Sequence, residues 1–294
     1  MMASGKKTLF IVLIAVGLIG FMVMLAAAVL ASLGDSGMDF SYGKSVAIVE
    51  VRGVIDVSDG IVRLINKYCD NSSVKAIVLR VDSPGGGVAA SQEIYEALRK
   101  AKARKPVVCS MAEVAASGGY YISCVCDSIV ANPGTLTGSI GVIMEFPVAE
   151  ELMKKIGLKF EVLKAGDSKD IGSPFRQMKP EERVLLQDMI NDVHAQFIQA
   201  VADGRKMPFD SVKQLADGRV FSGRQALARR LVDRLGTLDD AVDLAAKMTG
   251  ITGKPRITKE RRRMFNVFDL LTSAAETMAQ FEKTGVRLQY KMAR

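Results

Sequence analysis

Ser117 is the residue whose type and neighbours best suit covalent chemistry. It lies in the segment EVAASGGYY, residues 113–121, among small residues that let a ligand or another backbone come close. The apolar run 106–109 upstream favours a strand, and residues 120–125 favour a helix. A hydroxyl at a strand-to-helix turn, beside the free N–H groups of a helix N-terminus, suits a serine nucleophile with an oxyanion hole. A packing turn made of small residues is the alternative that this segment alone leaves open.

A serine nucleophile needs a base, and the choice in this chain is narrow. The single histidine, His194, lies in the middle of an expected helix in a polar stretch, where a surface histidine is the simplest interpretation. A lysine can serve instead when partial desolvation leaves its amine neutral. Lys169 is the candidate because it lies in a glycine-containing loop beside Ser168 and Ser173. A solvated loop lysine is the alternative.

Glycine-rich loops follow two of the expected strands. The loop DSPGGG, residues 82–87, follows the strand expected at 74–81, and NPGTLTGSIG, residues 132–141, follows the strand expected at 128–131. Three glycines after a strand let a backbone N–H point at a substrate carbonyl, although a flexible turn explains them equally well. The first loop lacks both the P-loop pattern and the dinucleotide-binding pattern.

The remaining periodicity predicts an α/β protein. Further strands are expected at 45–51, from Val107, and at 159–164, and helices at 59–69, 91–103, 180–204, 210–216, 223–230 and 237–248. Strands that alternate with helices predict βαβ units and a mostly parallel sheet. In such sheets, sites form at the carboxyl ends of the strands, where the loop 82–87 and the turn before Ser117 both lie.

The charges and cysteines exclude several classes of function. The formal net charge of the 294-residue chain is +8, but residues 254–294 carry ten basic and four acidic residues, so the rest is nearly neutral. A neutral body with a basic tail does not resemble a nucleic-acid-binding protein. The four cysteines have no CxxC spacing and no histidine partners, which argues against zinc. Buried free thiols are the default, and a Cys109–Cys124 disulfide stays open for an extracytoplasmic domain.

Residues 8–33 are apolar and uncharged, long enough to cross a hydrocarbon core of about 30 Å. Lys6 and Lys7 precede this segment, and Asp35 and Asp39 follow it. The positive-inside rule then places residues 1–7 in the cytoplasm and everything after residue 33 outside. We expect an uncleaved anchor with a tether at 34–44. A cleaved signal peptide is the alternative, because small residues lie near the end of the run.

Five segments together resemble the signal peptide peptidase A family. They are RVDSPGGG (80–87), EVAASGGYYIS (113–123), ANPGTLTGSIGVI (131–143), KDIGSP (169–174) and DGRVFSGRQA (217–226). The resemblance runs from about residue 45 to residue 246 and includes the N-terminal anchor. It implies a ClpP/crotonase-like α/β fold with an N-terminal transmembrane helix, a Ser/Lys protease domain at 45–250, and a basic tail at 251–294.

The resemblance also implies a role for individual residues. Ser117 would be the nucleophile and Lys169 the general base, with Ser139 orienting the lysine amine. The backbone N–H groups of Gly86 and Gly118 would form the oxyanion hole. This chemistry needs no metal and no cofactor.

The family cuts remnant signal peptides in the membrane and assembles into rings that stand on it. The resemblance therefore implies apolar peptide substrates, contact with lipid, a homo-oligomer, and a single-pass protein of the inner membrane with its catalytic domain in the periplasm. The tail could lie on an anionic membrane, pack on a neighbouring protomer, enter an active site, or be a solvated terminus. A crotonase-like acyl-CoA enzyme and a non-catalytic membrane scaffold are the competing interpretations of the whole chain.

Overall fold

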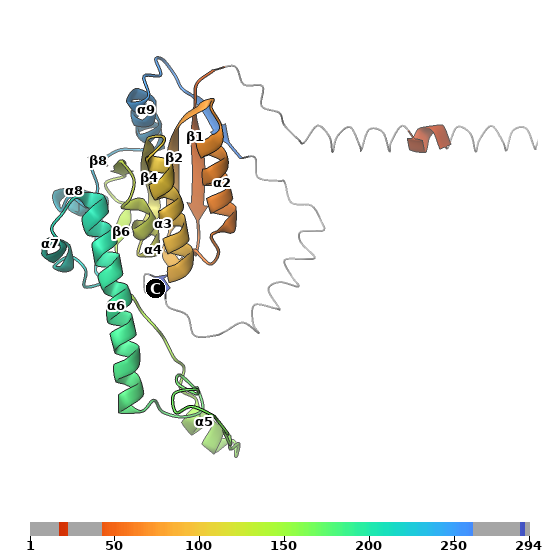
Figure 1. The fold of residues 1–294 in the computed structure, drawn as a ribbon, viewed down its shortest axis with the longest axis vertical. Helices are drawn as coiled ribbons and strands as arrows, with labels where there is room; N and C mark the ends of the chain where they lie inside the picture. The colour runs from red at the N-terminus through yellow and green to blue at the C-terminus, as the bar shows by residue number, and fades with distance from the viewer. Residues whose placement is uncertain (1–17, 23–42, 261–288, 292–294) are drawn as a thin grey trace, which may run out of the picture. The chain divides into compact units, whose positions relative to one another are not determined.

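A computed structural model describes residues 18–22, 43–260 and 289–291 (Figure 1). The chain divides into two units, Met1–Tyr42 and Gly43–Arg294. Of the expected anchor at 8–33, only residues 18–22 are described, and they are helical. No helix within the described ranges is long and apolar enough to cross a membrane. The other anchor residues, and tail residues 261–288 and 292–294, lie outside the described part.

The second unit is built on a mixed sheet in which most strand pairs are parallel. The strand order is β7-β6-β4-β2-β1-β9, with β5 pairing with both β4 and β8. Only the pair β6–β7 is antiparallel among these strands of the described chain. The bounds are β1 Ser45–Arg52, β2 Val74–Ser83, β4 Val107–Ala116, β5 Ser128–Ala131, β6 Leu136–Gly138, β7 Val220–Ser222, β8 Arg234–Leu235 and β9 Arg256–Lys259. The predicted α/β class with a mostly parallel sheet is confirmed.

Helices cover both faces of the central strands, which explains why those strands are continuous apolar runs. Along β1, Ala47 and Val49 belong to the larger core, with residues of α2 (Asp59–Asp70) and α3 (Val88–Lys102). Val46 and Ile48 instead pack with residues of α9 (Leu238–Met248) on the opposite face. A strand buried on both faces needs apolar residues at every position rather than at alternate ones.

The other helices lie close to their expected positions, apart from one that was not foreseen. They are α4 (Gly118–Ser123), α6 (Pro180–Arg205), α7 (Phe209–Lys213) and α8 (Gly223–Ala228). The unforeseen helix, α5 (Glu150–Lys155), has glutamates in its first turn and lysines in its last, the arrangement that complements a helix dipole. A turn of this length is too short for periodicity to reveal.

The prediction of a strand at 159–164 is wrong. These residues form no strand and are all exposed, and Leu163 is fully so. The segment has strand-like residues but no neighbouring strand with which to share hydrogen bonds. Instead the ring of Phe160 stacks on that of Phe175, with centroids 3.7 Å apart. We call residues 143–179, which contain this segment and α5, the arm; Figure 1 shows α5 at the end of α6 away from the sheet.

The C-terminal half of α6 packs against α4 at very short range. A Cβ at Gly204 would lie 2.1 Å from the carbonyl oxygen of Cys124, which follows α4 directly. Nearby, Phe197 is fully buried on α6 and its ring meets that of Tyr121 edge-on, with centroids 5.0 Å apart. Gly204 therefore lets α6 hold the helix that begins after Ser117.

We expect Gly204→Ala to destabilise the protein by about 1–3 kcal/mol, because the added methyl meets backbone that has no room to move. The matched control is Gly60→Ala in α2, where nothing lies within 4 Å of the added atom. That change should stabilise by about 0.5–1 kcal/mol through helix propensity. Urea unfolding of both variants checks the prediction, and a stabilising Gly204→Ala would contradict the close approach.

Candidate active site

The backbone of Ser117 has a conformation that non-glycine residues rarely adopt. Its φ of 53° and ψ of −118° turn the chain sharply from β4 into α4. The Ser117 N–H donates to the Gly138 carbonyl at 2.8 Å, and the Ser117 carbonyl accepts from the Tyr121 N–H at 2.8 Å. Such a conformation costs about 1–3 kcal/mol and persists only where neighbours enforce it. The strain marks this turn as a candidate functional site.

The Ser117 hydroxyl is nearly enclosed and uncommitted. The residue is 1% exposed, and its Oγ has no hydrogen-bond partner among the described residues. A buried polar atom without a partner is unfavourable, and in native structures it calls for an explanation. Reserving the hydroxyl for a group that arrives from elsewhere is one such explanation.

Glycines bring the loop after β2 against this turn. Residues Gly85–Gly87 form a short strand, β3. A Cβ at Gly118 would lie 2.7 Å from Ser91 Oγ and 3.2 Å from the Gly86 nitrogen. The Gly86 and Gly118 backbones are therefore adjacent, as an oxyanion hole made of their two N–H groups requires.

The Gly86 backbone is held in turn by Ile55. The Ile55 N–H donates to the Gly85 carbonyl at 2.9 Å, and the Gly87 N–H donates to the Ile55 carbonyl at 2.8 Å. A Cβ at Gly86 would lie 2.3 Å from the Ile55 carbonyl oxygen, so no larger residue fits. Ile55 and Ser91 are not predicted from the sequence, because the partners of a glycine backbone leave no pattern of their own. The apolar Val54-Ile55 after Gly53 is the only signal.

Ser139 lies at the same edge of the sheet as Ser117. In the parallel pair β4–β6, Ala116 is opposite Gly138, so the next residue of each strand is a serine. Ser139 is also at positive φ, 51°, is 6% exposed, and donates its N–H to the Arg219 carbonyl at 2.9 Å. The structure thus brings together Ser117, Ser139, Gly86 and Gly118 at the carboxyl ends of β2, β4 and β6.

Lys169 is the one predicted site residue that the structure does not place with Ser117. It is exposed in the arm, and Ser117 Oγ has no hydrogen-bond partner in the part described, so the lysine amine does not bond to it within this chain. His194 is half-buried on α6, and its Nε2 also has no partner among the described residues. The histidine is therefore not bonded to Ser117 either.

An ion-pair network fixes the loop that carries Lys169. Arg176 donates to Asp170, with its Nε 2.8 Å from Oδ2, and to Glu182, with its Nη2 2.6 Å from Oε1. Because of Arg176, the pKa of Glu182 falls to about 2, and the pKa of Asp170 lies well below its usual range. Carboxyls with lowered pKa values stabilise the fold above about pH 4 and lose that effect as the pH falls toward 2. The arm is thus tied to the start of α6 at all physiological pH values.

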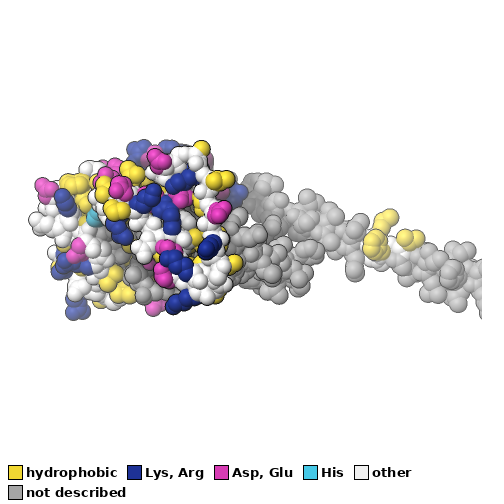
Figure 2. Space-filling view, turned by 90° about the horizontal axis from the view of Figure 1, so that it is seen from below, with side chains coloured by type: hydrophobic (Ala, Val, Ile, Leu, Met, Phe, Trp, Pro, Cys, Tyr) yellow, Lys and Arg dark blue, Asp and Glu magenta, His cyan; other side chains and the backbone are white. Residues whose placement is uncertain are grey.

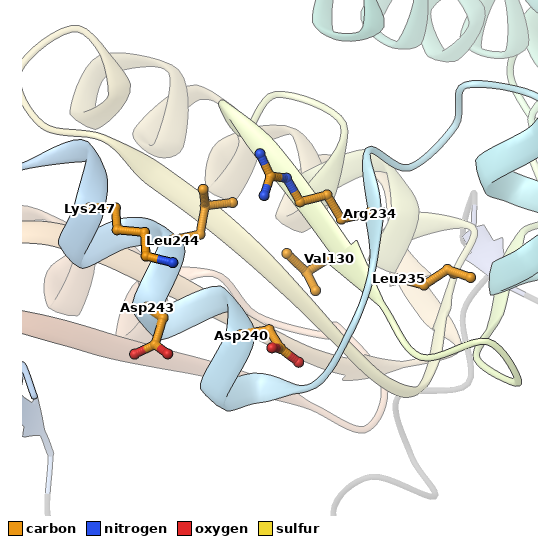
Figure 3. A pocket seen from close by; sticks show the side chains of 7 residues that line it. All are labelled: Val130, Arg234, Leu235, Asp240, Asp243, Leu244 and Lys247. Carbon is orange, nitrogen blue, oxygen red and sulfur yellow. The ribbon is translucent and has the colours of Figure 1, made fainter.

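Two further features of the described chain, the cysteines and a small pocket, lie apart from this site. All four cysteines are buried and free, as predicted, and burial raises the pKa of the Cys124 thiol to about 12. A pocket of about 180 Å³ lies between α9 and strands β5 and β8, lined by charged and apolar side chains that include none of the predicted site residues (Figure 3). Its Asp240 carboxylate already caps α9 by accepting from the Thr237 N–H at 2.7 Å.

No metal site is evident in the part of the chain described, and the face shown in Figure 2 carries no basic patch. No group of three or more His, Cys, Asp or Glu side chains among those residues could hold a metal ion. Figure 2 shows basic and acidic side chains intermixed over the visible face, with apolar side chains between them.

Comparison with known proteins identifies the family. Residues 99–252 match the model of peptidase family S49, and residues 55–129 match that of Clp protease. The chain belongs to peptidase family S49. It is 44% identical over 210 residues to a putative protease of Synechocystis sp., covering 71% of this chain and 76% of that protein. It is 35% identical over 259 residues to a putative protease of Methanocaldococcus jannaschii, covering 83% of this chain and 81% of that protein.

Membership of family S49 makes the chain a serine peptidase and confirms the resemblance to signal peptide peptidase A. A putative signal peptide peptidase of Enterococcus faecium is 39% identical over 189 residues, covering 64% of this chain and 55% of that protein. The solved structure of a membrane-bound stomatin-specific protease superposes with a TM-score of 0.51 at 14% identity, covering 76% of this chain and all of the other. That likeness supports the ClpP-like fold.

The strain at Ser117 gives a stability prediction that is independent of activity. Ser117→Gly should be about 1–2 kcal/mol more stable than Ser117→Ala, because glycine adopts this φ and ψ without a Cβ clash. At Ser211, an exposed position in α7, the order should reverse, since alanine favours a helix. Urea unfolding compares the two pairs, and equal stability of the Ser117 variants would contradict the strain.

Proposed function

We propose that this S49 peptidase is a membrane-anchored endopeptidase with a Ser117/Lys169 dyad that degrades remnant signal peptides at the membrane. The observation that carries the proposal is the Ser117 turn. Its hydroxyl is uncommitted, its backbone is strained, and the glycine N–H groups of β3 and α4 lie beside it. These are the parts that acyl transfer requires, apart from the base.

The proposed reaction uses only groups of the protein. Neutral Lys169 takes the Ser117 proton as Oγ bonds to the peptide carbonyl carbon, and the lysine then gives that proton to the leaving amine as the C–N bond breaks. The Gly86 and Gly118 N–H groups stabilise the oxyanion, each by roughly 3 kcal/mol. Ser139 orients the lysine amine. Water then hydrolyses the acyl-enzyme by the same proton path.

We further propose that Lys169 is supplied by a neighbouring copy of the chain. Within one chain the Ser117 hydroxyl has no partner among the described residues, and Lys169 is exposed on an arm tied to α6. The arm and the adjacent half of α6 expose many large apolar side chains, an excess that favours contact with another protein: Val148, Leu152, Ile156, Val162, Leu163, Val184 and Leu185. A groove of about 550 Å³ beside them, lined by residues such as Phe146, Leu186 and Ile190, could receive such side chains.

A head-to-tail contact of this kind closes into a ring when the rotation permits. The ring would enclose sites that each take Ser117 from one copy and Lys169 from the next. Residues 8–33 would anchor each copy with its N-terminus in the cytoplasm, the tether 34–44 leading to an extracytoplasmic protease domain at 45–250 and a tail at 251–294. Apolar peptides such as signal peptide remnants, released in the lipid, would be the substrates, and the name of the Enterococcus faecium relative supports this class.

The dyad is tested by single variants and by mixing them. Ser117→Ala and Lys169→Ala should each lose at least about 10³-fold in kcat/KM on an apolar fluorogenic peptide, with unfolding curves like that of the wild type. When the two inactive variants are unfolded together and refolded in detergent, activity should return to about a quarter of the wild-type level, because random assembly places an intact serine beside an intact lysine.

The controls separate the possible outcomes. Each variant refolded alone should stay inactive, and Lys159→Ala, which changes another exposed lysine of the same arm, should keep at least half of the activity. Wild-type-like activity in either single variant would refute the dyad. Inactive mixtures that still form mixed oligomers would refute the lysine in trans and leave the dyad within one chain.

We also expect kcat/KM to rise between about pH 5 and about pH 9, because only a deprotonated Lys169 can accept the serine proton. The carboxylates that hold the arm to α6 stay charged throughout this range, so the rise does not report loss of the arm. Initial rates measured over this range, with circular dichroism at each pH, check the prediction. A flat profile would contradict a lysine base.

A further inference from the structure

A strand from the end of the chain lies on the edge of β3. Residues Gln289–Lys291 form β10, which pairs antiparallel with β3 in a small sheet of its own. Tyr290 is opposite Gly86, with Gln289 opposite Gly87 and Lys291 opposite Gly85. The strand also lies against α3 and against α4, the helix that begins directly after Ser117. The C-terminal segment is thus placed beside the candidate active site.

The alternation of a strand shows which groups of β3 face the tail. The Gly85 carbonyl and the Gly87 N–H are both bonded to Ile55 on one side. Successive residues of a strand direct their backbone groups to opposite edges, so the N–H and carbonyl of Gly86 point to the other side. That other side is where β10 lies, with Tyr290 in register. The N–H assigned to the oxyanion hole therefore faces the tail strand.

The free edge of β3 can bind the main chain of a peptide without contacts to its side chains. It consists of three glycines, and added atoms at Gly86 or at the adjacent Gly118 would collide with backbone or with Ser91. An extended peptide can add to such an edge through its own N–H and carbonyl groups, whatever its sequence. This edge suits extended apolar peptides of varied sequence, and β10 binds in the same manner.

We propose that the C-terminal segment 289–291 is a built-in competitor that occupies the peptide-binding edge of β3 and blocks the Gly86 N–H until a substrate displaces it. The proposal rests on the proposed role of Gly86 beside Ser117. The 28 residues 261–288 connect this strand to the end of the protease domain. Fully extended they would span about 90 Å, so their length permits the contact. A tethered segment acts at an effective concentration of the order of millimolar, so even a weak three-residue pairing competes.

Hydrogen exchange tests this occupancy without relying on catalysis. In full-length Ser117→Ala protein in detergent, the amide of Gly86 should be protected, and deleting residues 289–294 should speed its exchange about tenfold or more. Tyr290→Pro, which removes a backbone N–H from β10, should do the same. Thr284→Pro, in the same tail but outside β10, is the matched control and should keep the protection. Equal exchange in all four proteins would overturn the proposal.

Kinetics then show whether occupancy inhibits. In the active protein, deleting residues 289–294 should lower KM for a short apolar peptide by about twofold or more with kcat little changed, and a synthetic peptide of residues 285–294 should compete with the substrate. Faster exchange with no peptidase activity in any protein would leave the tail contact standing and refute the proposed function. Unchanged exchange in an active enzyme would refute the tail contact and leave the proposed function standing.

Discussion

The backbone of Ser117 is held at positive φ by hydrogen bonds on both sides, to Gly138 in β6 and to Tyr121 in α4. This constraint determines much of what surrounds it. The turn must be so sharp that α4 starts against β3, which only glycines at positions 86 and 118 allow. Tyr121 and Gly204 then let α6 hold α4 in place from the other side. A strained turn survives only where packing of this kind enforces it.

The parallel sheet brings most of the predicted site residues to one edge, whereas Lys169 lies elsewhere, on the arm. The strands β2, β4 and β6 all end there, which places Ser117, Ser139 and the glycine N–H groups together. Lys169 lies instead on an exposed arm braced by Arg176 between Asp170 and Glu182. In the mechanism proposed above, a single chain lacks its base and would be inactive until copies assemble, which would protect other proteins from an unassembled protease. The tail strand on β3 would add a second restraint of the same kind.

The sequence is enough to predict the class of fold, most elements and the pieces of the site, because these depend on local patterns. The apolar runs 74–81 and 107–109, the glycine loop 82–87 and the A-S-G-G turn each lie where expected. The strand expected at 159–164 is absent, because strand-like residues form a strand only beside a partner. The pairings of Gly86 with Ile55 and of β3 with β10 join segments distant in sequence, and three consecutive glycines carry no pattern that identifies their partners.

In the proposed mechanism the Ser117 hydroxyl is the nucleophile of this S49 peptidase, and every other role depends on it. The most direct measurement is to label the full-length protein in detergent with a serine-reactive fluorophosphonate and to map the adduct by mass spectrometry. We expect one adduct, on Ser117, which forms much more slowly in the Lys169→Ala variant and is absent from Ser117→Ala. An adduct on another serine that accompanies loss of activity, or an active enzyme whose Ser117 stays unlabelled while another residue reacts, would contradict it.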